Sequence, residues 1–286
     1  MRLSLVLAAA LATTASAAAA QDAPDTPAKK TLACEDPAFR QDEASPALTA
    51  ADFFRPGELV FFDCRVAGYR TQEKDEIVRL KLSFTAIATD ARGLKLAAPV
   101  SGRFDTELAA QDQDYRPRVR YRFELPVLMP GGVYRVEVVV RDEFAESEVR
   151  LARDFRVRAP EFTAREFGIR ELTFLRGDAP IRQAVYRPGE AVTAKFDIVG
   201  FTVGEANRVA VSYSVSVQSP IAKVRLDDGS VTRYDDKSFY PVAYVPANFG
   251  VQLTPDSPKG EYRVTLKLRD EIANATREEQ FTFRVE

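Results

Sequence analysis

A duplicated pattern of turns and strands constrains the fold of this 286-residue chain more than any other feature. Segment 54–69, FRPGELVFFDCRVAGY, is matched by segment 186–201, YRPGEAVTAKFDIVGF. The stretch that begins at Gly132, GVYRVEVVVRDEFA, is matched by the one that begins at Gly260, GEYRVTLKLRDEIA. The two blocks occur in the same order in both halves, which indicates two copies of one domain.

The first block of each copy is typical of a tight turn followed by a strand. Arg-Pro-Gly-Glu at 55–58 and at 187–190 places Pro and then Gly at the central positions of a type II turn, where a fixed φ and then a positive φ are needed. Apolar residues then alternate with polar ones over 60–66 and 192–198. A period of two with one apolar side predicts a half-buried antiparallel strand.

The second block alternates even more regularly. It starts at Tyr134 and Tyr262 and leads through a short loop to a last strand that ends in Phe-Arg-Val. Further alternating strands are predicted over Val78–Ala88 and Val209–Val217, and no amphipathic helix is evident after the N-terminal segment. Seven or so short strands per copy predict a β-sandwich.

The Gly-x-Tyr that opens the second block resembles the tyrosine corner of immunoglobulin-like and fibronectin type III-like sandwiches, and tandem copies behind a signal peptide are similar to many exported bacterial proteins. The resemblance implies an all-β chain of two tandem immunoglobulin-like antiparallel β-sandwiches. The sequence departs from antibody domains because it has no Trp and carries Val136 and Val264 where the second core Cys would stand. Packing alone should therefore hold each pair of sheets together.

The N-terminus has the pattern of a secretory signal peptide. Met1 and Arg2 precede a mostly apolar run to Ala12, and the stretch ends in small residues up to Ala20. The apolar run is too short to span a bilayer and no second one follows, so no transmembrane segment is expected. We expect a periplasmic or secreted protein. The predicted organisation is a signal peptide at 1–20, a flexible leader at 21–30, a first sandwich at 31–158, a linker at 159–164 and a second sandwich at 165–286.

Composition excludes several classes of site. The chain has no His and only 2 Cys, which excludes histidine-based triads, His-ligated zinc or haem and cysteine zinc ribbons, and no cofactor or metal is predicted. With 40 basic and 42 acidic side chains the net charge is −2, which gives no reason to expect nucleic acid or an anionic membrane as a partner.

The two cysteines are predicted to form a disulfide. Cys64 lies on the apolar side of its strand, and Cys34 lies where a leading strand is expected. An exported protein passes through an oxidising compartment, where such a pair becomes oxidised. The bridge would close a loop of about 30 residues, worth roughly 3 to 4 kcal/mol in the chain-entropy model. The alternative is two unpaired thiols.

An aromatic stretch in the second copy is a candidate for partner binding. Exposed aromatic side chains anchor protein partners or stack on sugars, whereas buried ones fill a core. Two prolines in the stretch favour a long irregular loop, where functional surfaces tend to lie. The candidate residues are Tyr234, Phe239, Tyr240 and Tyr244, with Phe249 nearby.

Acidic residues recur in both copies. Arg141-Asp142-Glu143 and Arg269-Asp270-Glu271 end the Tyr strands, where we expect the carboxylates to cap turn N–H groups. Other acidic loops could hold calcium, although none has a defined calcium-loop spacing and solvated loops are the expectation. These are Asp105, Asp112 and Asp114 in the first copy and Asp227, Asp228, Asp235 and Asp236 in the second.

These features favour a non-catalytic exported protein that serves as a binding or scaffolding module in the bacterial periplasm or cell envelope. Its partner would be another envelope protein or a surface polysaccharide. One alternative is a periplasmic assembly chaperone of the two-sandwich type, although the basic cleft and donor strand of such proteins are not evident. An enzyme with a carboxylate-based site is the other, but no motif places a nucleophile beside a base.

Overall fold

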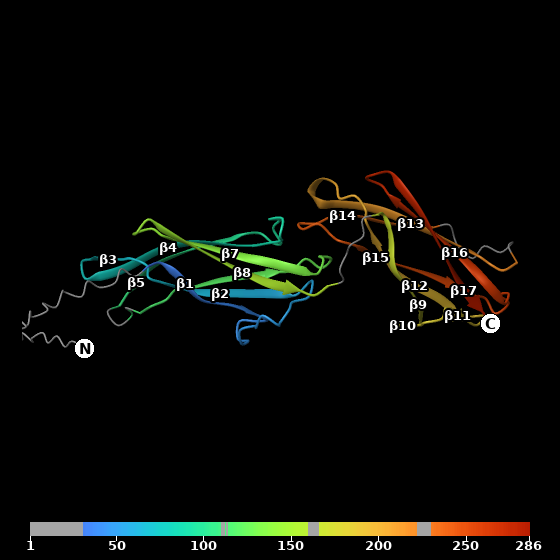
Figure 1. Ribbon diagram of the computed structural model, residues 1–286, viewed down its shortest axis with the longest axis horizontal. Helices are drawn as coiled ribbons and strands as arrows, with labels where there is room; N and C mark the ends of the chain where they lie inside the picture. Colours follow the sequence, from blue (N-terminus) through green and yellow to red (C-terminus); the bar gives the residue numbers. More distant parts are fainter. Residues whose placement is uncertain (1–30, 110–111, 113, 160–165, 222–229) are drawn as a thin grey trace, which may run out of the picture. The chain divides into compact units, whose positions relative to one another are not determined.

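The computed structural model describes residues 31–109, 112, 114–159, 166–221 and 230–286, and these residues form four β-sheets (Figure 1). No α-helix occurs among them, which confirms the all-β prediction. The predicted signal peptide and leader lie outside the described residues, as does most of the predicted linker. None of the described segments is a helix long and apolar enough to cross a membrane.

The first half of the chain builds two sheets. One is three-stranded with the order β1-β2-β6, and the other has the order β3-β4-β7-β8 with β5 also paired to β4. The bounds are β1 (Ala33–Arg40), β2 (Leu59–Ala67), β3 (Thr71–Lys74), β4 (Ile77–Thr89), β5 (Val100–Leu108), β6 (Arg118–Glu124), β7 (Gly132–Asp142) and β8 (Ser147–Val157).

The second half builds two sheets of matching order. They run β10-β9-β12-β15 and β11-β17-β16-β13-β14. Hence β9-β12-β15 repeats β1-β2-β6, and β13-β16-β17 repeats β4-β7-β8. The bounds are β9 (Gly168–Arg176), β10 (Ala179–Pro180), β11 (Val185–Tyr186), β12 (Ala191–Val199), β13 (Arg208–Gln218), β14 (Val231–Lys237), β15 (Val245–Gln252), β16 (Gly260–Asp270) and β17 (Ala275–Val285).

Each half has its own apolar core between its two sheets. The period-two alternation turns one side of every long strand inward, so that Val136, Val138 and Val140 of β7 are fully buried. Val264, Leu266 and Leu268 of β16 are buried in the same way in the second core. With one exception, Tyr240, the buried residues of the first core come from 32–157.

The turns and corners predicted by the repeat are formed. Gly57 and Gly189 have φ of 80° and 87°, the positive values that the Pro-Gly turns require. The Tyr134 hydroxyl donates to the Pro130 carbonyl at 2.6 Å, and the Tyr262 hydroxyl donates to the Pro258 carbonyl at 2.8 Å. This bond to a backbone carbonyl just upstream is the geometry of a tyrosine corner.

Candidate functional site

The aromatic residues predicted to bind a partner do not share one exposed surface. Tyr240 is only 3% exposed and packs into the core of the first half, where its hydroxyl donates to Asp90 Oδ2 at 3.1 Å. Burial raises the pKa of this hydroxyl, and the neighbouring Asp90 raises it further. The prediction that Tyr240 is an exposed recognition residue is therefore wrong, because its ring fills a core.

The other aromatic residues are dispersed. Phe239 is 60% exposed, whereas Tyr234 lies half-buried on β14 and Tyr244 is half-buried just before β15. Phe249 is buried in the second core on β15. The predicted long irregular loop is thus limited to the segment between two strands, and only Phe239 offers a largely exposed ring.

Cys34 and Cys64 are both free thiols in the structure, so the disulfide predicted between them is not shown there and stays a prediction. Cys34 of β1 is paired with Val66 of β2, and the register of the two strands shifts between Glu35 and Ala38. Cys64 therefore lies diagonally across from Cys34 instead of directly opposite it. A hydrogen bond with Cys64 lowers the pKa of the Cys34 thiol, and burial opposes this effect.

The repeated turn carboxylates have a structural role, as the sequence predicted. Asp142 is buried and accepts hydrogen bonds from the N–H groups of Arg70, Phe144 and Ala145. Asp270 accepts from the N–H groups of the equivalent residues, Thr202, Ile272 and Ala273. Burial raises the pKa of Asp270, but the hydrogen bonds outweigh burial and hold it below its usual value.

The glutamates that follow are used in the same way in both halves. The Ser83 hydroxyl donates to Glu143 Oε1 at 2.6 Å, and the Ser212 hydroxyl donates to Glu271 Oε1 at 2.6 Å. These two hydroxyl–carboxylate pairs look like activated nucleophiles. Their occurrence at equivalent positions of both halves assigns them to the common turn instead.

The acidic loops do not form a metal site within the described part of the chain. No group of three or more Asp, Glu or Cys side chains comes close enough there to hold an ion. Asp235 is instead engaged by Arg208, whose Nη2 lies 2.6 Å from Asp235 Oδ2. Asp227 and Asp228 lie outside the described residues.

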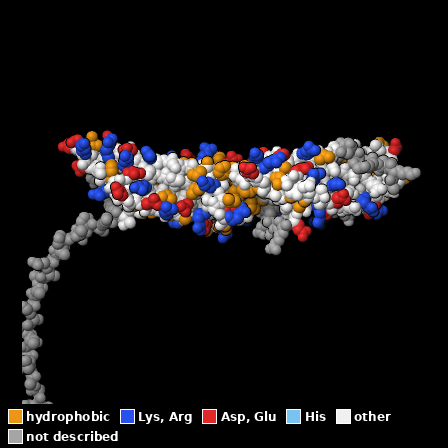
Figure 2. All heavy atoms as spheres, turned by 90° about the horizontal axis from the view of Figure 1, so that it is seen from above, with side chains coloured by type: hydrophobic (Ala, Val, Ile, Leu, Met, Phe, Trp, Pro, Cys, Tyr) orange, Lys and Arg blue, Asp and Glu red, His pale blue; other side chains and the backbone are white. Residues whose placement is uncertain are grey.

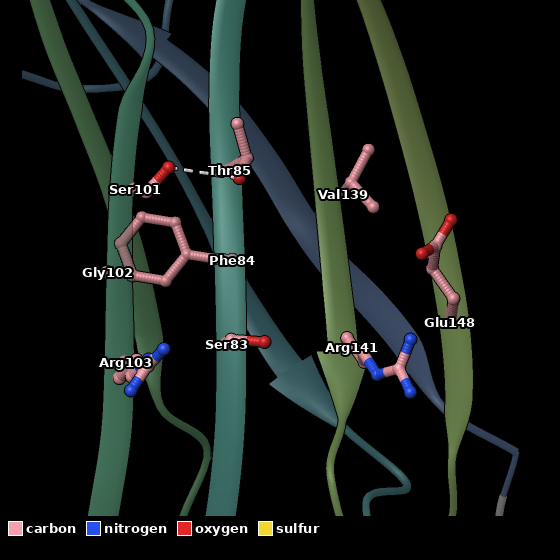
Figure 3. Close-up of a pocket in the computed structure, with 9 residues that line it drawn as sticks. All are labelled: Ser83, Phe84, Thr85, Ser101, Gly102, Arg103, Val139, Arg141 and Glu148. Carbon is pink, nitrogen blue, oxygen red and sulfur yellow. Dashed lines mark hydrogen bonds between the residues drawn. The ribbon is translucent and has the colours of Figure 1, made fainter.

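A cavity of about 570 Å³ lies on the sheet that contains β4, β5, β7 and β8 (Figure 3). Figure 3 shows the Phe84 ring lying across Gly102 of β5, with Ser101 hydrogen-bonded to Thr85 at 3.1 Å. Arg103, Arg141 and Glu148 supply its charged groups. The hydroxyls of Ser101 and Thr85 are hydrogen-bonded to each other and can also hydrogen-bond a polar ligand.

The outer face of the β1-β2-β6 sheet carries a cluster of arginines that the sequence analysis did not single out. On β6, Val119, Tyr121 and Phe123 point into the core, so the residues between them face outward. Pairing with β2 places Arg65 opposite Arg118, Asp63 opposite Arg120 and Phe61 opposite Arg122. We call this surface the arginine face; its basic members are Arg40, Arg65, Arg116, Arg118, Arg120 and Arg122.

Half of these arginines are paired with carboxylates. Arg40 Nε and Arg118 Nη2 lie 3.0 and 2.8 Å from Asp63 Oδ2, and Arg116 Nη1 lies 2.6 Å from Glu35 Oε2. Burial raises the pKa of Asp63, but Arg118 and Arg40 outweigh burial and hold this pKa below its usual value. Asp63 is therefore ionised at neutral pH and neutralises part of the cluster.

The other three arginines are not neutralised within the described residues. Arg65 and Arg120 are exposed and make no ion pair there, and Arg122 lies over the Phe61 ring with its Cζ 5.5 Å from the ring centroid. Arg65 also faces Arg118 across the ladder, and like charges in that position destabilise a sheet. The pairing of Arg65 with Arg118 therefore contributes no favourable charge interaction across the ladder.

The equivalent face of the second half lacks the arginines. The β12–β15 register places Pro246 at the position of Arg118, Asn248 at that of Arg120 and Gly250 at that of Arg122. The signal was visible in the sequence as Arg at every second position in RPRVRYRFE. Only the strand pairing shows that these arginines share one outward face of β6.

Another part of the surface carries basic and acidic side chains in a mixture. On the face of the molecule that Figure 2 shows, basic and acidic side chains are interspersed, and hydrophobic side chains gather between them. In the first half, Arg135 and Asp154 form an ion pair whose Nε and Oδ1 lie 2.7 Å apart.

Comparison with protein-family models gives no match, and no curated protein sequence matches the chain. Among solved structures the chain is similar to the C-terminal domain of the AgI/II polypeptide BspA of Streptococcus agalactiae. The match has 11% sequence identity and a TM-score of 0.29, and it covers 87% of this chain and all of that one, 100%. A likeness this distant carries no argument about the function of this chain.

Proposed function

We propose that this chain is an exported, non-catalytic binding or scaffolding module of the bacterial periplasm or cell envelope. The observation that carries the proposal is the unequal use of polar side chains in the two halves. Polar groups that both halves share are engaged in turns, whereas the arginine face occurs in one half only. The second half folds without an arginine face, so we infer that the arginines of the first half are available for binding.

The shared polar groups argue against catalysis. Asp142 and Asp270 each accept backbone hydrogen bonds, and Glu143 and Glu271 each accept a serine hydroxyl. A catalytic carboxylate pair needs two groups with different environments. In this chain Asp142 corresponds to Asp270 and Glu143 corresponds to Glu271, and both members of each pair lie in the same environment.

Export is supported by the N-terminal sequence. Its short basic start, apolar run and small residues are the features that a signal peptidase substrate requires.

Cell fractionation followed by co-sedimentation tests the proposal. The full-length chain, expressed in a Gram-negative host, should be recovered in processed form outside the cytoplasm. The processed protein should then sediment with washed envelope fragments in a saturable manner. Retention of the N-terminal segment in the cytoplasm, or failure to sediment with envelopes of any composition tested, would contradict it.

A further inference from the structure

We infer that the arginine face binds a linear acidic polysaccharide, with Arg120 and Arg122 as the principal contacts. This inference rests on the proposed function and names its ligand class. The two side chains are exposed and alternate with core residues of β6, so they project from the same side of one strand about 7 Å apart. Strand β6 lies at the edge of its sheet.

The arginine side chains of this face favour a ligand that presents anionic oxygens. Arginine presents a rigid planar set of donors that matches a carboxylate or sulfate in a bidentate manner. Arg65 and Arg120 make no ion pair within the described residues, so they can accept an external anion without breaking an internal one. Arg118 is engaged by Asp63 through Nη2, and its Nε is buried, so Arg118 is not counted among the contacts.

Three carboxylates lie on or beside the arginine face and limit where an anionic ligand can bind. Asp63 is held between Arg40 and Arg118 at the centre. Glu43 and Asp63 line the small cavity of about 80 Å³ together with Arg118, Arg120 and Arg122, and Glu124 ends β6 opposite Leu59. Asp63 is already engaged by Arg40 and Arg118, whereas Arg120 and Arg122 make no ion pair within the described residues, so these two remain available to an extended chain that presents acidic groups at regular intervals.

Two other polyanions fit the face less well. Single-stranded nucleic acid needs bare aromatic rings on which bases stack, and the aromatic ring of this face, Phe61, is covered by the Arg122 guanidinium. A bilayer surface favours apolar side chains that insert beside the basic ones. On this face Phe61 lies under the Arg122 guanidinium, and the ladder neighbours of Arg120 are Arg118, Arg122 and Asp63.

Binding to polygalacturonate, measured by titration calorimetry on the processed full chain, tests the inference. We expect saturable binding to polygalacturonate and none to neutral dextran. The affinity should fall when salt is raised, as charge-based recognition requires. The double variant Arg120→Gln/Arg122→Gln should weaken binding by about tenfold or more, since each charge-assisted contact contributes strongly.

A matched control removes the same charge elsewhere. Arg233 and Arg263 are exposed arginines of the second half, so Arg233→Gln/Arg263→Gln should leave the affinity within about twofold. Arg120→Lys/Arg122→Lys retains the charge and the fold and should give an intermediate loss. This variant keeps the test decisive if the glutamine variant fails to fold.

Three results would overturn the inference. These are no binding to polygalacturonate, an equal loss in both glutamine variants, and tighter binding to a single-stranded oligonucleotide or to anionic vesicles. If envelope co-sedimentation persists while polygalacturonate does not bind, the ligand class is wrong and the binding module stands. If wild-type protein does not sediment with envelopes, the proposed function itself fails.

Discussion

At the scale of single residues, the buried carboxylates Asp142 and Asp270 organise the two halves. Each accepts three backbone N–H groups, two from its own turn and one from a segment more than sixty residues away in sequence. An acceptor that serves three partly buried donors is costly to remove, because each donor then loses its partner. We expect these residues to be needed for folding.

Asp270→Asn should lower the free energy of unfolding at neutral pH by about 1 to 3 kcal/mol, since the new amide group would face the Thr202 N–H, itself a donor. The pKa of Asp270 is lowered in the folded state, so the stability that its charge contributes is present above the carboxyl's ordinary pKa and is lost as pH falls through the folded-state value. Urea denaturation from pH 7 to 3 should show the difference shrinking.

The control for this measurement is Asp178→Asn, an exposed carboxylate, which should change stability by less than about 0.5 kcal/mol. Equal stability of Asp270→Asn and the wild type at pH 7 would show that the turn does not depend on this acceptor.

The cysteine pair gives a second residue-scale prediction. The Cys34 thiol, whose pKa is lowered by a hydrogen bond with Cys64, is the more easily ionised of the two and is the expected attacking thiolate. We expect the protein isolated from the periplasm without reductant to contain the Cys34–Cys64 disulfide. Thiol titration of the denatured protein should then detect none before reduction and two after it. Two thiols before reduction would contradict the prediction.

At the scale of elements, Gly102 couples strands β4 and β5. A Cβ at this position would lie 2.5 Å from the Phe84 ring, which in turn stacks on Phe104 with centroids 5.5 Å apart. The glycine therefore makes room for the ring on the neighbouring strand. Its replacement should force the ring out of its position.

Gly102→Ala should lower the free energy of unfolding by about 1 to 3 kcal/mol because of overpacking. In Phe84→Ala/Gly102→Ala the second substitution should cost much less, since the clash has been removed. A double-mutant cycle by chemical denaturation measures this coupling. Additive losses would show that Phe84 and Gly102 do not depend on each other.

Much of the strand structure could be predicted from sequence because local signals agreed with tertiary ones. Pro-Gly turns and period-two alternation placed β4, β7, β13 and β16 within a residue or two of their bounds. The arginine face was missed since it needs Arg40 from β1, Arg65 from β2 and the β6 arginines at once. Only strand pairing, which a single sequence does not show, brings these side chains together.

At the scale of the whole molecule, Tyr240 shows the same limit of sequence reasoning. It belongs to the second half by sequence and to the first core by packing. A second contact joins the same loop to another segment of the first half, because the Ala243 N–H donates to the Leu128 carbonyl at 2.8 Å. An aromatic residue in a loop between strands does not reveal which core it enters.

Tyr240→Ala should lower the free energy of unfolding by about 3 kcal/mol, because it leaves a cavity in the first core. Phe239→Ala, which truncates the exposed neighbouring ring, should change it by less than about 0.5 kcal/mol. Thermal and urea denaturation of the two variants measure the contrast. Equal effects would indicate that Tyr240 is not part of that core.

The molecule as a whole has a net charge of −2, so long-range attraction does not draw it toward polyanions. Recognition of an acidic polymer therefore depends on the local arrangement of arginines in the first half. The repeat provides an internal reference for this interpretation. The second half folds with Pro246, Asn248 and Gly250 at the positions of the β6 arginines.

Arginine side-chain NMR tests the binding role of the arginine face most directly. In a titration of the labelled, processed chain with oligogalacturonate, the Nε–H signals of Arg120 and Arg122 should shift together and saturate. The signals of Arg233 and Arg263 should stay in place. Unchanged Arg120 and Arg122 signals at a saturating ligand concentration, or shifts spread evenly over all exposed arginines, would contradict the account.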